Sequence, residues 1–124
     1  MPKAPPPVLP KRLTVLEQAA LVAGSGAPRA KDYDPPRINH IRIARLWEAM
    51  LDLPQGFIGA RKAALMMGAV KLAREAAVAK EDNYVDLAGY ALCASEIAEE
   101  EKSGPPEDEV VCERLVVRLN EVRQ

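Results

Sequence analysis

Clusters of proline and glycine divide the chain into segments of helical length. Proline cannot continue a helix and glycine commonly follows the end of one, so breaks are expected at Gly24, at Pro54 and Gly56, and within SGPP at 103–106. Between these breaks apolar residues recur every three or four positions, and no alternating β pattern competes anywhere. We therefore predict an all-α fold, a bundle of four to five helices.

The composition fits one helical domain. A chain of 124 residues has room for a single modest core. Aromatic residues make up only 4%, so the core must consist mainly of Ala, Leu, Val, Ile and Met, which suits close helix packing. Because a small Ala-rich core buries little area per residue, we expect the chain to form a homo-oligomer.

The N-terminal segment differs from the rest. Residues 1–12, MPKAPPPVLPKR, predict an extended, disordered arm, because proline lacks an amide donor and disfavours helix in the residue before it. The predicted helical domain comprises residues 13–124. Its first helix is expected to start at Thr14, which has the capping-box spacing with Glu17, and to stop at Gly24.

A second helix is predicted to start within DPP at 34–36 and to run to about Asp52. The carboxylate of Asp34 can cap exposed amides, and proline is tolerated in a first helical turn. Apolar residues fall on two faces, which is typical of a helix in the middle of a bundle. These faces carry Ile43, Trp47 and Met50, and Ile38, Ile41 and Leu46.

Three more helices are expected, over about 59–79, 83–102 and 107–122. Only the short polar break KEDN separates the first two of these, so they should form an antiparallel helical hairpin at the centre of the bundle. The last helix has acids at its start and arginines later, as the helix dipole prefers. The inward face predicted for 59–79 consists of Ala63, Met66 or Met67, Val70, Ala73 and Ala77.

The predicted hairpin gathers charged side chains in a background of alanine and leucine. Equal distance from the turn places Arg74 and Glu75 level with Asp86, and Lys71 level with Tyr90. One interpretation is structural: Arg74 pairs with Asp86, since charges near a core are normally paired. The other is an anionic-ligand site, in which Lys71 and Arg74 hold phosphate, Asp86 holds a metal or a sugar hydroxyl, and Tyr90 stacks or hydrogen-bonds.

Further residues near the hairpin are candidates for the same site. Asn39, His40 and Asp82 could add polar contacts. Gly89 lies inside a predicted helix, where glycine costs about 1 kcal/mol relative to alanine. Such a glycine permits either a close helix contact or the approach of a ligand.

The composition disfavours several classes of protein. A net charge of −1 argues against a protein that coats nucleic acid. One histidine and two cysteines, Cys93 and Cys112, are too few for a Cys/His zinc site, and the cysteines are expected to be small residues in a reducing compartment. No apolar run approaches the ~20 residues of a membrane span, and no secretory segment is seen. We expect a cytoplasmic protein without membrane contact.

The stretches KDYDPPRINHIRIARLWEAML, ALMMGAVKLAREA and DNYVDLAGYA resemble a family of small helical proteins from phages and prophages, which is catalogued only as a domain of unknown function. With VLEQAALVAG upstream, the likeness covers about residues 14–98. Asp34 departs from the usual glycine, and His40 from the usual phenylalanine, so His40 is interpreted as a partly buried substitute for an aromatic residue. The matching residues are Tyr33, Pro36, Asn39, Ile43, Ala44, Leu46, Trp47, Met66, Met67, Lys71, Ala73, Arg74, Asp82, Val85, Asp86, Gly89, Tyr90 and Ala91.

The hairpin is also similar, more distantly, to MazG-like nucleotide pyrophosphohydrolases, all-α enzymes that bind Mg²⁺ with Glu-x-x-Glu on one helix and Glu-x-x-Asp on the next. Asp86 fits the last acid, but Asn83 stands three residues earlier. Lys71 and Arg74 occupy places where acids would be needed, with Glu75 alone nearby. This inversion of charge would repel Mg²⁺ and favour a bare phosphate, so the resemblance implies the outline of the fold more than the activity.

Two functions follow from these observations. The first is a phage-type accessory protein, in the host cytoplasm, that binds a nucleotide or another phosphorylated small molecule through Lys71, Arg74, Glu75, Asp86 and Tyr90. The second is a non-enzymatic helical interaction module, which the missing acids, the Ala-rich faces and the proline arm favour.

Overall fold

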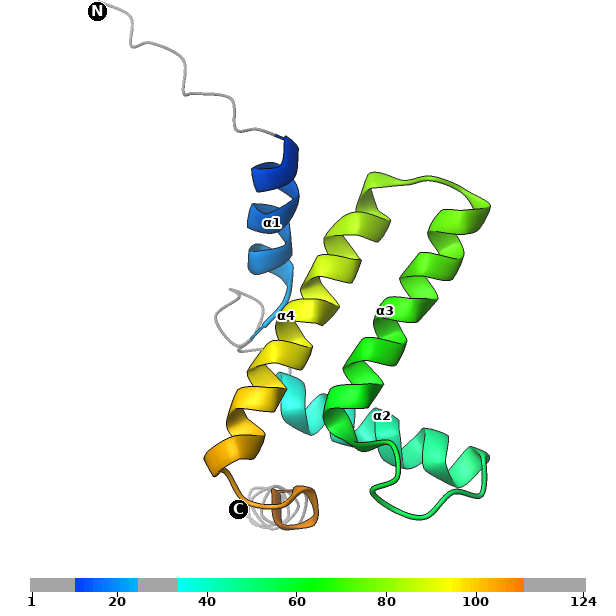
Figure 1. Ribbon diagram of the computed structural model, residues 1–124, viewed down its shortest axis with the longest axis vertical. Helices are drawn as coiled ribbons and strands as arrows, with labels where there is room; N and C mark the ends of the chain where they lie inside the picture. Colours follow the sequence, from blue (N-terminus) through cyan, green and yellow to red (C-terminus); the bar gives the residue numbers. More distant parts are fainter. Residues whose placement is uncertain (1–10, 25–33, 111–124) are drawn as a thin grey trace, which may run out of the picture.

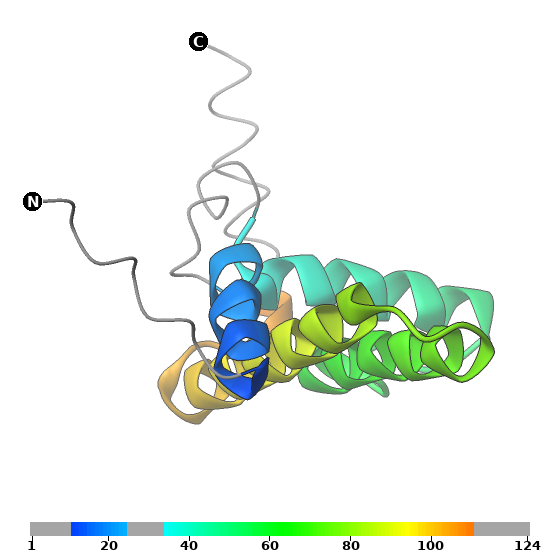
Figure 2. The ribbon, with the colours of Figure 1, turned by 90° about the horizontal axis from the view of Figure 1, so that it is seen from above.

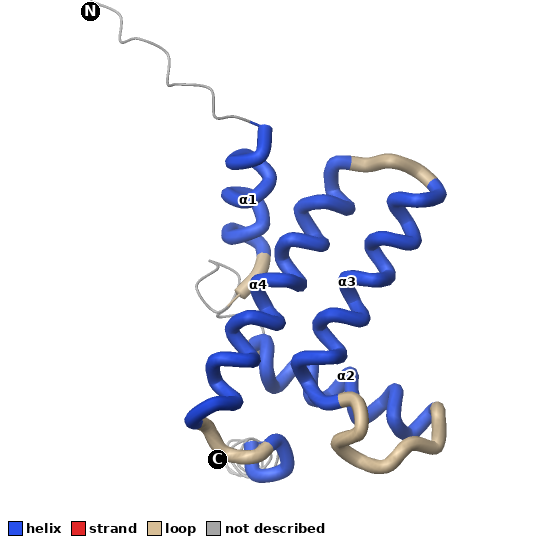
Figure 3. Tube along the Cα trace, in the orientation of Figure 1, coloured by secondary structure: helices blue, strands red, loops and turns tan. Residues whose placement is uncertain are grey.

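The structure is a computed structural model that describes residues 11–24 and 34–110, and all regular structure in these ranges is helical. Four helices follow in order: α1 Lys11–Val22, α2 Pro36–Met50, α3 Gly59–Ala77 and α4 Glu81–Ser103. A further helix begins at residues 107–110. No strand occurs among the described residues (Figure 3), and the predicted all-α bundle of four to five helices is confirmed.

α3 and α4 form the predicted antiparallel hairpin (Figure 1). α4 is the central helix, because α1, α2 and α3 all contact it. Viewed from above, α3 and α4 form one layer with α2 on one side of it, and no described segment covers the other side (Figure 2). One broad face of the hairpin therefore remains open.

The core lies where α2 crosses the hairpin. Ile41 and Ile97 are fully buried and pack with Ala60, Ala64, Cys93 and Ala94 in one cluster. A second cluster, of Ala44, Ile58 and Ala63, extends toward the loop after α2. Burial of each isoleucine stabilises the fold by about 1.5–3 kcal/mol, and the alanines allow the helices to approach closely.

α2 contradicts the prediction of two buried faces. Ile41 and Ala44 are buried, but Leu46 and Met50 are 65% and 71% exposed. α2 packs against α3 and α4 with one face only, so it lies at the edge of the bundle. The middle position belongs to α4.

The predicted start of the first helix is wrong, whereas α2 begins within DPP at 34–36, as predicted, but without Asp34 as its cap. α1 begins at Lys11, so Thr14 lies inside the helix and not at its cap. The N-cap of α2 is Pro35, while the carboxylate of Asp34 pairs with Arg42 further along the helix.

The predicted arm at 1–12 and the last predicted helix at 107–122 lie largely outside the described residues. Residues 11 and 12 belong to α1 and not to the arm. Residues 107–110 are helical, as predicted.

α3 is rotated about its axis relative to the prediction. Ala63 is buried and Met67 half-buried, but Met66, Val70, Ala73 and Ala77 are exposed. Gly68, Lys71 and Glu75 turn inward in their place. Because apolar residues occur on nearly every side of α3, its sequence alone does not identify the face that packs inside.

Gly89 lies where Ala23, the residue after α1, approaches α4 closely. A Cβ placed on Gly89 would lie only 2.9 Å from the Cβ of Ala23. The glycine therefore serves a close helix contact, one of the two roles that the sequence allowed.

Replacing Gly89 with valine should destabilise the protein by about 1–3 kcal/mol, because α1 must move away from α4 to admit the side chain. Urea unfolding measures the effect. Ala49→Val, at an exposed position of α2, is the matched control. Equal unfolding midpoints for the two variants would contradict the proposed contact.

Candidate functional site

The charged pair across the hairpin is formed by Lys71 and Asp86. The Lys71 Nζ atom lies 2.9 Å from Asp86 Oδ2, and the two side chains are 14% and 30% exposed. The predicted pairing of Arg74 with Asp86 is therefore wrong. The rotation of α3 explains the difference, because it turns Lys71 toward α4.

Arg74 and Glu75 are separated from this pair. The side chain of Arg74 is exposed and forms no ion pair within the described residues. Glu75 points toward the hairpin turn, where its Oε1 accepts a hydrogen bond of 2.9 Å from the amide of Lys80. Its hydrogen bond and negative charge also raise the pKa of the Tyr84 hydroxyl. Glu75 thus organises the turn.

The ring of Tyr90 contacts the ring of His40. Their rings pack edge to face, with centroids 6.1 Å apart and an angle of 88° between the planes. His40 is buried, and its Nδ1–H donates to the carbonyl of Pro36 at 2.8 Å. Among the described residues its Nε2 has no hydrogen-bond partner. Burial lowers the pKa of His40, although the bond to Pro36 opposes this change. These contacts agree with His40 as a substitute for an aromatic residue.

The remaining candidates lie elsewhere. Asn39 and Asp82 are both exposed. Asp82 and Asp86 line a hollow of about 310 Å³ between α1 and α4, together with Gln18, Leu21, Val22 and Val85. In the described part of the chain, no three His, Cys, Asp or Glu side chains gather as a potential metal site. The predicted site residues are thus divided among the hairpin, its turn, the His40 contact, this hollow and, for Asn39, the exposed side of α2.

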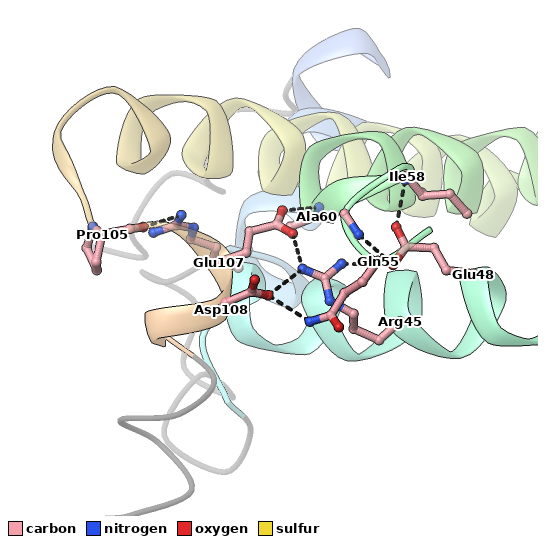
Figure 4. Close-up of polar contacts among 10 residues, drawn as sticks. Arg45, Glu48, Gln55, Ile58, Ala60, Pro105, Glu107 and Asp108 are labelled. Carbon is pink, nitrogen blue, oxygen red and sulfur yellow. Dashed lines mark hydrogen bonds and ion pairs between the residues drawn. The ribbon is translucent and has the colours of Figure 1, made fainter. Parts of the chain in front are cut away.

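A polar network that the sequence analysis did not identify surrounds the loop between α2 and α3 (Figure 4). Its centre is Glu48, which is only 2% exposed. The Glu48 carboxylate accepts hydrogen bonds from the amides of Gly56 at 3.1 Å and Ile58 at 2.7 Å, and from Arg45 at 2.9 Å. A buried acid thereby holds the loop in place.

Arg45 connects this acid to the residues after α4. Its guanidinium lies 2.7 Å from Glu107 and 3.4 Å from Asp108. Glu107 also accepts a 2.7 Å hydrogen bond from the amide of Ala60, in the first turn of α3. Two carboxylates therefore satisfy amides at the N-terminus of α3, where the helix dipole favours negative charge.

Arg37 makes a second link to the end of α4. Its guanidinium is buried and donates to the carbonyl of Pro105 at 2.7 Å. The positive charge lies beside the C-terminal end of α4, which the helix dipole favours. Arg37, Arg45 and Glu48 together join α2 to both helices of the hairpin.

The network is structural in character. Burial disfavours the charge of Glu48, but the amides of Ile58 and Gly56 and the guanidinium of Arg45 outweigh this and lower its pKa. The sequence carries one signal of it: Glu48 shares the helical stripe of the buried Ile41 and Ala44.

Comparison with known families shows which family this chain belongs to. Residues 14–98 match the family described as Domain of unknown function (DUF6378). The chain belongs to this family. Searches of curated proteins and of solved structures return no match. Among the described helices, none is long and apolar enough to cross a membrane.

Glu48→Gln should destabilise the protein by about 2–3 kcal/mol at neutral pH, because a neutral amide replaces the charged acceptor of two amides and a guanidinium. Urea unfolding measures the loss. Glu99→Gln, which removes an exposed acid whose one ion pair within residues 11–24 and 34–110 is with Lys102, should change stability little.

The loss of stability caused by Glu48→Gln should also depend on pH. The folded-state pKa of Glu48 lies below its ordinary 4.5, so its stabilising contribution is complete above pH 4.5 and is lost as pH falls through the folded-state value. The difference between the wild type and Glu48→Gln should shrink in acid. A constant difference down to the acid unfolding transition would contradict this assignment.

His40→Phe should make stability less sensitive to mild acid. The pKa of buried His40 lies below its ordinary 6.5, so the unfolded chain takes up the proton first and wild-type stability falls as pH drops below 6.5. Phenylalanine keeps a ring against Tyr90 and cannot titrate. Unfolding midpoints of both proteins above and below pH 6.5 test this, and parallel pH profiles would contradict it.

Proposed function

We propose that this chain is a non-enzymatic helical interaction module that binds another helical surface through the open side of the α3–α4 hairpin. This surface, called the hairpin face below, carries one stripe from each helix. The stripes consist of Leu65, Ala69, Leu72 and Ala76 on α3, and Tyr84, Ala88, Ala91 and Ser95 on α4.

The position of the hairpin face follows from helical geometry. Ala60, Ala63 and Ala64 of α3 join the clusters that contain Ile41 and Ala44 of α2. The stripe that begins at Leu65 lies about a quarter turn or more away, since successive residues of an α-helix are ~100° apart. It therefore points away from α2, toward the side that no described segment covers (Figure 2).

The observation that carries the proposal is the exposure of an uncharged, largely apolar surface. Leu65, Leu72 and Tyr84 are 50%, 55% and 48% exposed, and the residues between them are mostly alanine. A contiguous exposed apolar patch commonly marks an interaction site. None of the eight residues of the hairpin face is charged.

The native size of the protein in an extract of the cells that encode it tests this function. We expect the wild type to elute above its monomer mass of 13.5 kDa, and Leu72→Glu to elute as a monomer, because a carboxylate would be buried in the interface. Leu46→Glu, at an exposed position of α2, should elute like the wild type. Elution of the wild type as a monomer would refute the proposal.

A phosphorylated-ligand site at the hairpin is a second candidate. Lys71 and Asp86, two of the predicted ligand residues, are in contact, and Asp86 lines the hollow beside α1. A phosphate that displaced Asp86 would take its place as the counter-ion of Lys71. Binding of this kind needs no Mg²⁺. The phage-type role and the MazG-like relationship rest on the sequence resemblance alone.

Thermal shift with a panel of dNTPs and NMPs, with and without Mg²⁺, tests the second candidate. A ligand that binds the folded state raises its melting temperature by mass action. Asp86→Asn should increase the shift because it releases Lys71, and Lys71→Met should abolish it, whereas Arg61→Met should not. The absence of any shift at millimolar ligand would remove this candidate.

A further inference from the structure

We infer that residues 104–110, called the strap below, open and close over the start of α3 while the four helices stay folded. Closure holds the first turn of α3, and this turn leads into Leu65 at one end of the hairpin face. The inference rests on the proposed interaction function, because it adds a means of regulating the surface that performs it. Three features of the strap carry it: its attachment by polar contacts, its surplus of carboxylates, and its hold on the amide of Ala60.

The strap is attached to the bundle mainly by polar contacts. Five of its seven residues are exposed, and only Glu107 and Val110 are half-buried. Segments with few buried apolar contacts open at a lower free energy than the core of a protein. The polar partners of the strap are Arg37, Arg45, Gln55 and the amide of Ala60.

The bundle keeps its core when the strap is open. Both hydrophobic clusters consist of buried residues between Ile41 and Ile97. The family match, residues 14–98, also ends before the strap. Val110 packs against the cluster that contains Ile41 and Ile97. Opening therefore removes one half-buried apolar side chain from this cluster but none of the buried residues that form it.

The strap brings more negative charge to Arg45 than one guanidinium can neutralise. The guanidinium lies 2.9 Å from Glu48, 2.7 Å from Glu107 and 3.4 Å from Asp108. Glu48 is buried and also holds two amides of the loop before α3, so it stays in place when the strap leaves. Arg45 then keeps Glu48 as its partner. Opening thus removes the surplus carboxylates of the strap and leaves the buried carboxylate paired.

Closure of the strap fixes the start of α3. The Glu107 Oε1 atom accepts a hydrogen bond of 2.7 Å from the amide of Ala60, which is one of the first amides of the helix and has no partner within it. Gly59 has a φ of 73°, and a Cβ at this position would lie 3.3 Å from the same oxygen, so glycine leaves room for the carboxylate. Leu65 follows Ala60 by little more than one helical turn. An open strap thus loosens the turn that positions the Leu65 end of the hairpin face.

Residue-resolved amide hydrogen exchange of the full chain, measured by NMR in water and in low urea, tests the opening. If the strap opens by itself, the Ala60 amide exchanges faster than the amide of fully buried Ile97, and its rate does not rise with urea. The Ile97 amide should exchange only through global unfolding, so its rate should rise with urea. Equal rates and equal urea dependence for the two amides would overturn the inference, because the strap would then open only with the whole bundle.

Removal of the Glu107 carboxylate tests the contact itself. Glu107→Ala should accelerate exchange of the Ala60 amide by about tenfold or more, the factor that matches the loss of a hydrogen bond to a charged acceptor. The Ile58 amide, which Glu48 holds, should change little. Glu109→Ala, which removes an exposed acid from the same strap, is the matched control. Equal Ala60 exchange in the two variants would refute the hold of the strap on α3.

The link to the hairpin face has its own measurement. In the cell extract, Glu107→Ala should shift the chain from the larger complex toward the monomer, whereas Glu109→Ala should elute like the wild type. An unchanged complex together with faster exchange of the Ala60 amide would overturn the regulation of the hairpin face by the strap.

The strap and the interaction function can fail separately. A wild type that elutes as a monomer refutes the interaction function, while exchange of the Ala60 amide still decides whether the strap opens. Exchange of Ala60 that follows Ile97 refutes the strap, and a complex that depends on Leu72 still supports the interaction function. The comparison within the wild type needs no variant, so it decides the opening even if Glu107→Ala does not fold.

Discussion

The buried carboxylate of Glu48 holds the fold together at the point where three segments meet. Its oxygens satisfy the amides of Gly56 and Ile58 in the loop before α3 and pair with Arg45 on α2. Arg45 in turn reaches Glu107, which accepts from the amide of Ala60. Since a charge so deeply buried is tolerated only when fully paired, each group in this network requires the others. The angle at which α3 leaves α2 follows from these bonds.

The rotation of α3 about its axis then determines which side chains are exposed on the open side of the hairpin. With Ala60 and Ala64 packed toward α2, Lys71 turns toward Asp86, while Leu65 and Leu72 turn outward. The same rotation of α3 pairs Lys71, a predicted phosphate ligand, with Asp86 and leaves the apolar side chains of Leu65 and Leu72 exposed. For this reason we propose an interaction surface ahead of the ligand site that the charged residues of the sequence suggested.

Membership of a family of unknown function leaves the role of the chain to be argued from its own residues. Lys71 is paired with Asp86, and the exposed Arg74 lies apart from this pair. A single histidine can suggest a catalytic role. His40, however, is buried against Tyr90, and its Nδ1–H donates a hydrogen bond to the backbone carbonyl of Pro36. The polar groups of the core are thus engaged in holding helices together.

Local sequence signals determined much of this architecture. Helical spacing between clusters of proline and glycine indicated the all-α fold, the short KEDN break indicated the hairpin, and Gly24, with a φ of 81°, ends α1 near the predicted stop. These features are local because backbone hydrogen bonding in a helix, and the φ values open to glycine and proline, depend on neighbouring residues.

Only the tertiary structure decided which side of each helix packs inside. α3 is apolar on almost every side, so its rotation depends on distant partners, and the sequence analysis paired Asp86 with Arg74 when its partner is Lys71. The role of Glu48 was hidden for a similar reason. Its partners lie in the following loop and in the residues after α4, which the chain brings together only when it folds.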